Sequence, residues 1–276
     1  MFKILKVLNN NGILVMDLET KQEMIFLGKG VGFGKKVNEN VKEITNAKAY
    51  RFAQENARAD SIAAIKSISP LFIEIAGSII EEAEKKFGTV DNNILLPLAD
   101  HIAFAIKRMQ EGLELQNPFI KEIKVLFEEE YAVAEKGRDI IKQKTGELIS
   151  EDEVGYITLH VHTALTKEHI SQSMNIAKMI QEGLQYIEKK LKSSFNEETI
   201  SYTRLLTHMK FMILRVVNDE KLHLDMTEYV MGHFPDAFEL AKEICTHFEK
   251  EIKKPFSDIE ISYFAIHIER IKSIEE

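Results

Sequence analysis

The chain has 276 residues, of which 45% are hydrophobic and 29% charged, with a formal net charge of −8 and one cysteine. This length predicts two domains, or three if one is small. A single cysteine excludes an intramolecular disulfide framework and is typical of a reducing cytoplasm, where we expect the protein to act. No hydrophobic run approaches the roughly 18 residues of a membrane span, and the N-terminus lacks a signal-peptide pattern.

Residues 1–55 carry a net charge of +3, whereas residues 56–276 carry −11. A small basic head on an acidic body indicates that a polyanionic partner would meet the head. Short hydrophobic runs separated by turn residues predict an antiparallel sheet of three or four strands there, at 2–8, 13–16, 24–27 and 31–33. So few residues bury too little surface for comfortable stability, and we expect the head to dimerise.

Residues 38–59 are polar and predict a linker that is partly helical. The rest of the chain has the hydrophobic spacing of amphipathic helices, with Gly88 ending the first and Asn117-Pro118 breaking a later connection. The predicted helices are 71–87, 94–113, 119–145 and 151–168, followed by 173–193, 200–218, 233–252 and 257–274.

The two groups of helices are copies of one another. At an offset of 107 residues, 98–108 recurs as 205–215, and 153–161 recurs as 260–268. Two histidine pairs, each 59 residues apart, therefore stand in matching contexts: His101 with His160, and His208 with His267. The repeat predicts two homologous all-α helical bundles. We expect a multidomain chain with a small antiparallel β-sheet domain and linker at 1–57, then bundles at 58–170 and 171–276.

A glycine-rich stretch follows the third predicted strand, at 28–36. It is not a P-loop, since Lys29 stands where a glycine is required, nor a dinucleotide fingerprint, since Phe33 takes the place of the third glycine. Bare backbone, an aromatic ring and lysines are what single-stranded or looped RNA requires. The amides of Asn9, Asn10 and Asn11 can likewise contact bases or sugars. A bulged strand with a basic end and an ordinary turn are the alternatives.

The histidines do not predict a metal site. His160 and His162 lie about 200° apart around a helix, and no other histidine pair has the spacing of helix-borne ligands. No nucleophile motif for hydrolysis is present either. Two interpretations remain, a packed structural histidine or a neutral imidazole that accepts a phosphoryl group. Two phosphorylated sites in each repeat would make a graded electrostatic switch.

With these motifs, the sequence resembles the BglG/SacY-type transcriptional antiterminators of bacteria, and most closely the branch that controls glucose phosphotransferase genes. The resemblance spans the whole chain. Its most specific parts are two segments of the head and two of the second bundle, at 6–11, 28–36, 207–211 and 265–271.

The resemblance implies a co-antiterminator RNA-binding domain in the head and two phosphotransferase regulation domains in the bundles. The expected RNA-binding residues are Lys6, Asn9, Asn10, Asn11, Gly28, Lys29, Gly30, Phe33, Lys35 and Lys36. The implied phosphorylation sites are His101, His160, His208 and His267, with Asp100 beside the first and Thr207 in its place in the second domain. Lys29 departs from the arginine of many relatives and lacks its bidentate fork.

The implied function is transcription antitermination, in which the dimeric head binds an RNA hairpin in a leader transcript and blocks a competing terminator hairpin. The implied partners are this leader RNA of a sugar phosphotransferase operon, the sugar-specific permease, the carrier protein HPr and a second copy of the chain. Neither a cofactor nor a catalytic residue is implied. Phosphorylation of the first regulation domain by the permease is implied to inactivate the protein, and phosphorylation of the second by HPr to favour activity.

Two other classes of protein compete with this interpretation. A DNA-binding transcription activator with the same regulation domains would need a helix-turn-helix, which the β-patterned head does not provide. A metal-dependent hydrolase would need clustered histidine ligands, and the spacing argues against them.

Overall fold

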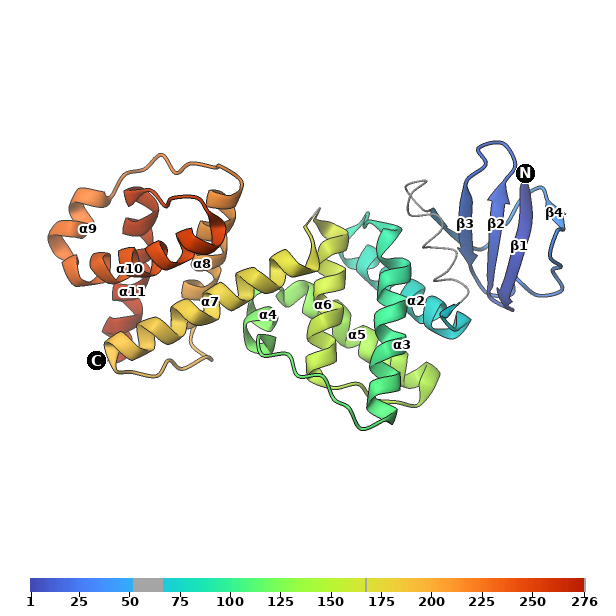
Figure 1. Cartoon of the computed structure of the whole chain (residues 1–276), viewed down its shortest axis with the longest axis horizontal. Coiled ribbons are helices and arrows are strands. Elements are labelled where there is room, and N and C mark those ends of the chain that lie inside the picture. Colours follow the sequence, from blue (N-terminus) through green and yellow to red (C-terminus); the bar gives the residue numbers. More distant parts are fainter. Residues whose placement is uncertain (52–66, 167, 276) are drawn as a thin grey trace. The chain divides into compact units, whose positions relative to one another are not determined.

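The computed structural model of the chain describes residues 1–51, 67–166 and 168–275. They form two compact units, the first made of Met1–Pro118 and Glu129–Ile170, the second of Phe119–Glu128 and Ser171–Glu276. A sheet and a helical bundle make up the first unit, and a helical bundle makes up the second (Figure 1). Residues 52–59 of the predicted, partly helical linker lie outside the described residues.

The head is a five-stranded antiparallel sheet of order β4-β1-β2-β3-β5. Its strands are β1 (Phe2–Asn9), β2 (Gly12–Asp17), β3 (Glu23–Leu27), β4 (Asn40–Val41) and β5 (Lys48–Arg51). Alternate side chains form its core, with Ile4, Ile13, Val15, Met24 and Phe26 all buried. The three long strands confirm the prediction. The predicted strand at 31–33 is wrong, and both edge strands come from the segment predicted as linker.

The first helical bundle has helices that begin and end at recognisable signals. Pro70 is the first residue of α2, and Gly88, with φ of 84°, follows its end. The Ser150 side chain accepts a hydrogen bond from the Glu153 amide and so caps α6. The helices are α2 (Pro70–Phe87), α3 (Leu95–Gln110), α5 (Glu128–Thr145) and α6 (Glu151–Leu165), with a short 3₁₀ helix η1 (Asn92–Ile94) before α3.

The second unit repeats this arrangement. Its helices are α7 (Ile170–Leu191), α8 (Ile200–Val217), α9 (Thr227–His233), α10 (Pro235–Ile252) and α11 (Asp258–Glu275). The short helix α4 (Ile120–Leu126) also belongs here. Lys210 of α8 donates to the Leu126 carbonyl at 2.6 Å and lies 4.3 Å from the centre of the Phe127 ring. The predicted all-α bundles are therefore confirmed.

Two helix predictions need correction. The expected helix at 119–145 is broken at Phe127, whose φ of −131° and ψ of 44° are not helical, so that α4 and α5 are separate. At the matching place in the repeat, Phe234 ends α9. This short helix was not predicted from the sequence. Among the described residues, none of the helices combines the length and hydrophobicity that a membrane crossing requires.

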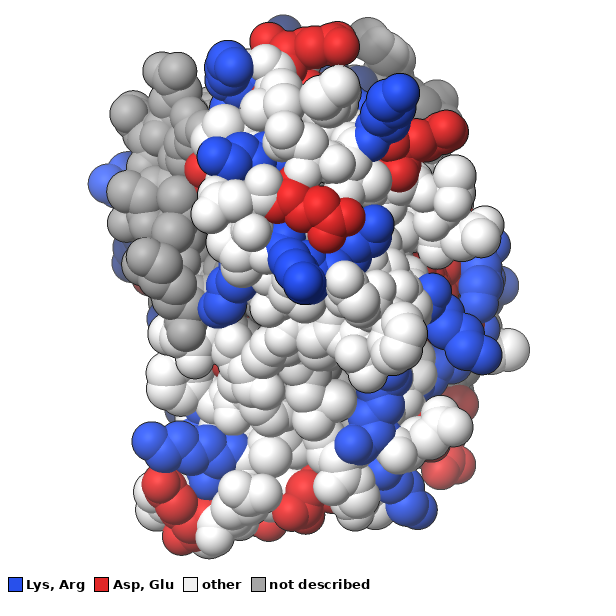
Figure 2. All heavy atoms as spheres, turned by 90° about the vertical axis from the view of Figure 1, so that its right-hand side faces the viewer, with Lys and Arg blue, Asp and Glu red and all other residues white. Residues whose placement is uncertain are grey.

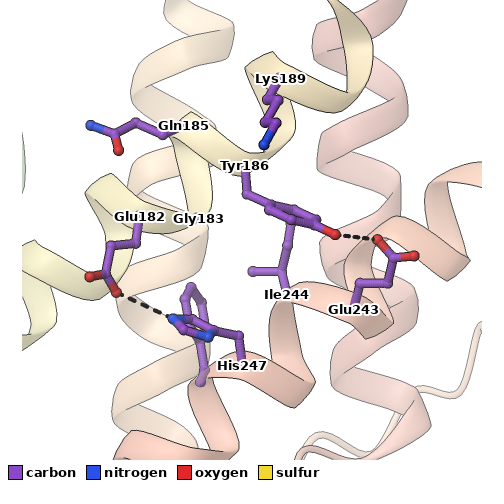
Figure 3. Close-up of a pocket in the computed structure, with 9 residues that line it drawn as sticks. Glu182, Gly183, Gln185, Tyr186, Lys189, Glu243, Ile244 and His247 are labelled. Carbon is purple, nitrogen blue, oxygen red and sulfur yellow. Dashed lines mark hydrogen bonds and ion pairs between the residues drawn. The ribbon is translucent and has the colours of Figure 1, made fainter.

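Each bundle has one helix contact in which a glycine packs against an isoleucine, but the two residue types stand on opposite helices. In the first, Ile79 of α2 packs against Gly137 of α5, and in the second, Gly183 of α7 packs against Ile244 of α10. The Phe248 ring occupies the space where a Gly183 side chain would stand. Gly183 and Ile244 also line an open hollow of about 530 Å³ between α7 and α10 (Figure 3). Two polar pairs border it, Tyr186 with Glu243 at 2.8 Å and Glu182 with His247 at 3.4 Å.

We expect Gly183→Ala to lower the free energy of unfolding of the second unit by about 1–3 kcal/mol, because the new methyl group overlaps Phe248. The matched control is Gly232→Ala in α9, where a Cβ meets nothing within 4 Å. There, the better helix propensity of alanine stabilises by up to about 1 kcal/mol. Urea denaturation followed by circular dichroism measures both, and equal effects would contradict this account of the contact.

Candidate RNA-binding loop and histidine sites

The glycine-rich segment 28–36 is a loop of turns fastened to the turn between β1 and β2. The Gly28 and Gly32 amides donate to the carbonyls of Asn11 and Asn10, both at 2.9 Å. The Gly30 amide donates to the Asn11 side-chain oxygen at 3.0 Å. Two motifs that are separate in the sequence therefore form one rigid surface.

The glycines in this loop have two different physical roles. A Cβ at Gly32 would overlap the Asn9 carbonyl, and one at Gly28 would overlap the Asn46 carbonyl. Gly30 and Gly34 instead have φ of 77° and 70° and open space around them. Left-handed conformations of this kind cost glycine nothing. Close packing against Asn46 thus requires a glycine at position 28, independently of any contact with RNA.

The side chains expected to contact RNA differ in exposure. Phe33 is 75% exposed, and Lys29, Lys36 and Asn10 are exposed as well. Lys35 is half-buried and pairs with Glu39 at 3.3 Å, and Lys6 is half-buried on β1. Figure 2 looks onto this end of the molecule and shows lysine, arginine and acidic side chains around a broad uncharged area.

Asn9 and Asn11 are held by hydrogen bonds on both sides of their amide groups. The Asn9 oxygen accepts from the Asn11 backbone amide at 2.8 Å, and the Asn11 oxygen holds Gly30. Both side-chain nitrogens donate to the carboxylate of Glu74 on α2, each at 3.2 Å. These asparagines therefore hold the turn and the loop together, and they also bind one helix of the first bundle.

The first histidine pair lies between α3 and α6. The ring centres of His101 and His160 are 5.2 Å apart, and Nε2 of His101 lies 3.1 Å from a carboxylate oxygen of Glu153. The His101 side chain is 16% exposed, whereas His160 is buried. Burial, helped by the neighbouring His101, lowers the pKa of His160 to about 3.

The second pair lies between α8 and α11 and is packed more closely. The rings of His208 and His267 stack with centres 4.2 Å apart. Nε2 of His208 is buried and has no hydrogen-bond partner among the described residues. Burial, with His267 and Arg215 nearby, lowers the pKa of His208 to about 3, and burial also lowers the pKa of His267. A histidine kept neutral in this way retains a lone pair that can attack phosphorus.

A buried carboxylate paired with an arginine accompanies each histidine pair, and no role for these residues was predicted from the sequence. Glu153 of α6 accepts from Arg108 of α3 at 2.7 Å. In the second repeat, Glu260 of α11 takes two hydrogen bonds from Arg215 of α8, both at 2.7 Å. Burial alone would raise the pKa of Glu153, but His101 and Arg108 outweigh it and hold that pKa below its usual value. Their recurrence at an offset of 107 was the available signal.

The remaining predicted residues lie as follows. Asp100 is exposed on α3, one residue before His101, and Thr207 is half-buried at the matching position of α8. His162 lies 2.9 Å from Glu130. Cys245 is a buried thiol whose pKa burial raises. Within the described ranges, no group of three or more His, Cys, Asp or Glu side chains is placed to hold a metal ion.

Comparison with known proteins assigns these domains to families. The model of the CAT RNA binding domain matches residues 2–59, and the model of the PRD domain matches residues 77–164 and again 181–271. The chain thus belongs to the family of transcription antiterminators that carry a CAT RNA binding domain and PRD domains, which are regulated by phosphorylation. The antiterminators of this family regulate transcription.

Several relatives match along the whole chain. Transcription antiterminator LicT of Bacillus subtilis is 33% identical over 98% of both chains. The beta-glucoside operon antiterminator of Dickeya chrysanthemi is 32% identical over 98% of this chain and 97% of its own. Protein GlcT of Staphylococcus haemolyticus is 31% identical over 97% and 95%. Identities this similar do not separate the branches.

A solved structure of a relative also matches this chain. The crystal structure of GlcT CAT-PRDI is 34% identical and aligns with a TM-score of 0.53. The alignment covers 60% of this chain and 98% of that chain. The sheet followed by a helical bundle is therefore the fold of a known relative.

The buried histidines predict a pH dependence of stability. Because the pKa of His160 and that of His208 are lowered from 6.5 to about 3, the unfolded chain binds more protons than the folded chain between these values. The free energy of unfolding therefore falls as the pH falls from 7 to 5, by up to about 2 kcal/mol for each histidine. Urea denaturation at several pH values measures this loss.

The loss should be smaller in His160→Asn and in His208→Asn, since each variant removes one of the groups that the unfolded chain protonates. The exposed His223 provides the control, and His223→Asn should leave the pH dependence unchanged. A wild-type chain equally stable at pH 7 and pH 5 would refute the assignment.

Proposed function

We propose that the chain binds an RNA hairpin in the leader transcript of a sugar phosphotransferase operon and so prevents a terminator hairpin from forming. The observation that carries this proposal is the loop 28–36, which sets exposed Phe33 and Lys29 beside the Asn9–Asn11 turn in a chain of the antiterminator family. An exposed ring can stack on an unpaired base, and lysine can neutralise phosphate.

The proposed RNA surface combines side chains from β1, the turn after it and the loop. Its members are Lys6, Asn9, Asn10, Asn11, Gly28, Lys29, Gly30, Phe33, Lys35 and Lys36. The fastening of the loop to the turn supports a single surface, because RNA that touches Phe33 comes within reach of the asparagines. A second copy of the chain would double this surface, and the uncharged area in Figure 2 offers room for such a dimer contact.

We further propose that His101, His160, His208 and His267 accept phosphoryl groups, from the sugar-specific permease in the first regulation domain and from HPr in the second. The close pairing of the rings supports a role for each pair as a unit. His160 is only 9% exposed, so that a donor reaches it only after α6 shifts. His101 is more exposed and would be the first acceptor of its pair.

The two regulation domains are proposed to have opposite effects, inactivation from the first and support of activity from the second. A phosphate on His101 would stand beside the Glu153 carboxylate, and like charges repel. In the second domain, His208 has Arg215 nearby, and this positive charge favours an added phosphate.

The proposed domain boundaries are 1–57 for the RNA-binding domain and its linker, 58–170 for the first regulation domain and 171–276 for the second.

A DNA-binding activator with PRD domains is the alternative that the sequence left open. Its helix-turn-helix would have to precede the first bundle. The described part of that region, residues 1–51, is a β-sheet, and the CAT RNA binding domain model matches it. These observations favour RNA over DNA as the ligand.

We expect Phe33→Ala to weaken binding of the full chain to its leader hairpin by about 10- to 100-fold, because one stacked base is worth about 1–3 kcal/mol. Phe211→Ala, which removes a phenylalanine 51% exposed on α8, should leave the affinity unchanged. Filter binding or fluorescence anisotropy at two salt concentrations gives both affinities, and affinity should fall as salt rises. Failure of the wild-type chain to bind any such hairpin would refute RNA binding.

Incubation with phosphorylated HPr and permease should label only histidines of the two pairs. Mass spectrometry under neutral conditions, which preserve phosphohistidine, locates the label. His223 and His247 serve as internal controls, because both are exposed and lie outside the pairs. Label on these controls, or none on the four proposed sites, would overturn the switch.

A further inference from the structure

The carboxylate of Glu74 on α2 binds the asparagine turn of the head. Its two oxygens accept from the side-chain nitrogens of Asn9 and Asn11, and one of them also accepts from Lys144 of α5 at 2.7 Å. Burial would raise the pKa of Glu74, but Lys144, Asn11 and Asn9 outweigh it and lower that pKa. Glu74 is therefore held as an anion at the centre of a small polar network.

Both side-chain amide groups of the turn are already engaged in hydrogen bonds. Each side-chain oxygen is engaged inside the head, Asn9 with the Asn11 amide and Asn11 with Gly30. Each nitrogen has two N–H groups and donates a hydrogen bond to the same carboxylate. Two neighbouring N–H donors converging on one anion are the parts from which a phosphate contact is made.

The contact belongs to a packed interface within the first unit. Tyr50 of β5 is fully buried, and its hydroxyl donates to the Gly77 carbonyl of α2 at 3.3 Å. Gly77 lacks a Cβ, and the Leu27 side chain occupies that space. Lys48 of β5 pairs with Glu84, two turns further along α2. Apolar burial and two polar anchors thus fix the head on this helix.

We propose that Glu74 takes the place of an RNA phosphate oxygen, so that α2 and RNA compete for the amides of Asn9 and Asn11. A carboxylate and a phosphate both present negative oxygens that accept from amide N–H groups. The head binds RNA fully only when Glu74 has left the turn, and the apparent affinity is reduced by the fraction of chains in which it is docked. This inference rests on the proposed RNA-binding function and adds its regulation.

The experiment compares the full chain with Glu74→Ala and with a matched control, Glu82→Ala. Both glutamates lie on α2, both side chains are 20% exposed, and both pair with a lysine of α5, Lys144 or Lys136. Both variants remove one negative charge, so any general gain in attraction for RNA is shared. We expect Glu74→Ala to bind the hairpin about 10-fold more tightly than Glu82→Ala, which corresponds to about 1.4 kcal/mol.

A second variant acts through packing and leaves every charge in place. Gly77→Gln places a long side chain on α2 where Leu27 and Tyr50 of the docked head stand, and the two collide with it. We expect it to tighten RNA binding in the same direction as Glu74→Ala. Hydrogen exchange provides an independent readout, since RNA should speed exchange in α2 of the wild-type chain.

The outcomes distinguish a failure of the competition at Glu74 from a failure of RNA binding itself. If the wild-type chain binds the hairpin but Glu74→Ala and Gly77→Gln bind no more tightly than Glu82→Ala, the competition is refuted and RNA binding stands. If the wild-type chain and all three variants fail to bind, the proposed function itself falls and the competition falls with it. Tighter binding by both variants, with circular dichroism like that of the wild type, supports the competition.

Discussion

Each histidine pair depends on a buried carboxylate held by an arginine of the facing helix. A carboxylate without a partner at this depth would cost several kcal/mol, so Glu153 must keep Arg108, and Glu260 must keep Arg215. Because the partners stand on different helices, the pair fixes how α3 lies on α6, and how α8 lies on α11. The histidines come from these same helices. The spacing of the histidine rings is therefore set by the arginine–carboxylate pair between the two helices.

The two repeats use this contact differently. Glu260 directs both oxygens to Arg215, which leaves the His208 ring to stack on His267. Glu153 has one oxygen on Arg108 and the other close to His101, so that the carboxylate is shared between a guanidinium group and an imidazole ring. A phosphate added at the proposed sites would enter a carboxylate-bound site in the first repeat and a site beside an arginine in the second. This asymmetry would give the proposed opposite effects of the two domains a physical basis.

The helical bundles were largely predictable because of the 107-residue repeat. A helical pattern in one copy was supported by the matching pattern in the other. The break at Phe127 was missed because no glycine or proline marks it in the first copy, where Glu128 follows. The second copy has Pro235 at that position, and proline at the start of a helix is the signal that locates the break in both. The strand predicted at 31–33 failed for another reason. Gly30 and Gly34 turn the backbone into left-handed conformations that end pairing on either side.

The docking of the asparagine turn on α2 had no sequence signal at all. Asn9 and Glu74 are 65 residues apart, and packing of the head on α2, through Tyr50 and Leu27 at Gly77 and through Lys48 at Glu84, brings them together. That placement also joins the two ends of the proposed switch. Helix α2 packs on α3, which carries His101, and on α6, which carries His160. Under the proposed phosphorylation, a charge that moved either histidine helix would also shift α2. The polar contact at Glu74 has donors about 3 Å away that tolerate little displacement. The helix that covers the asparagines thus also contacts both helices that carry the first histidine pair.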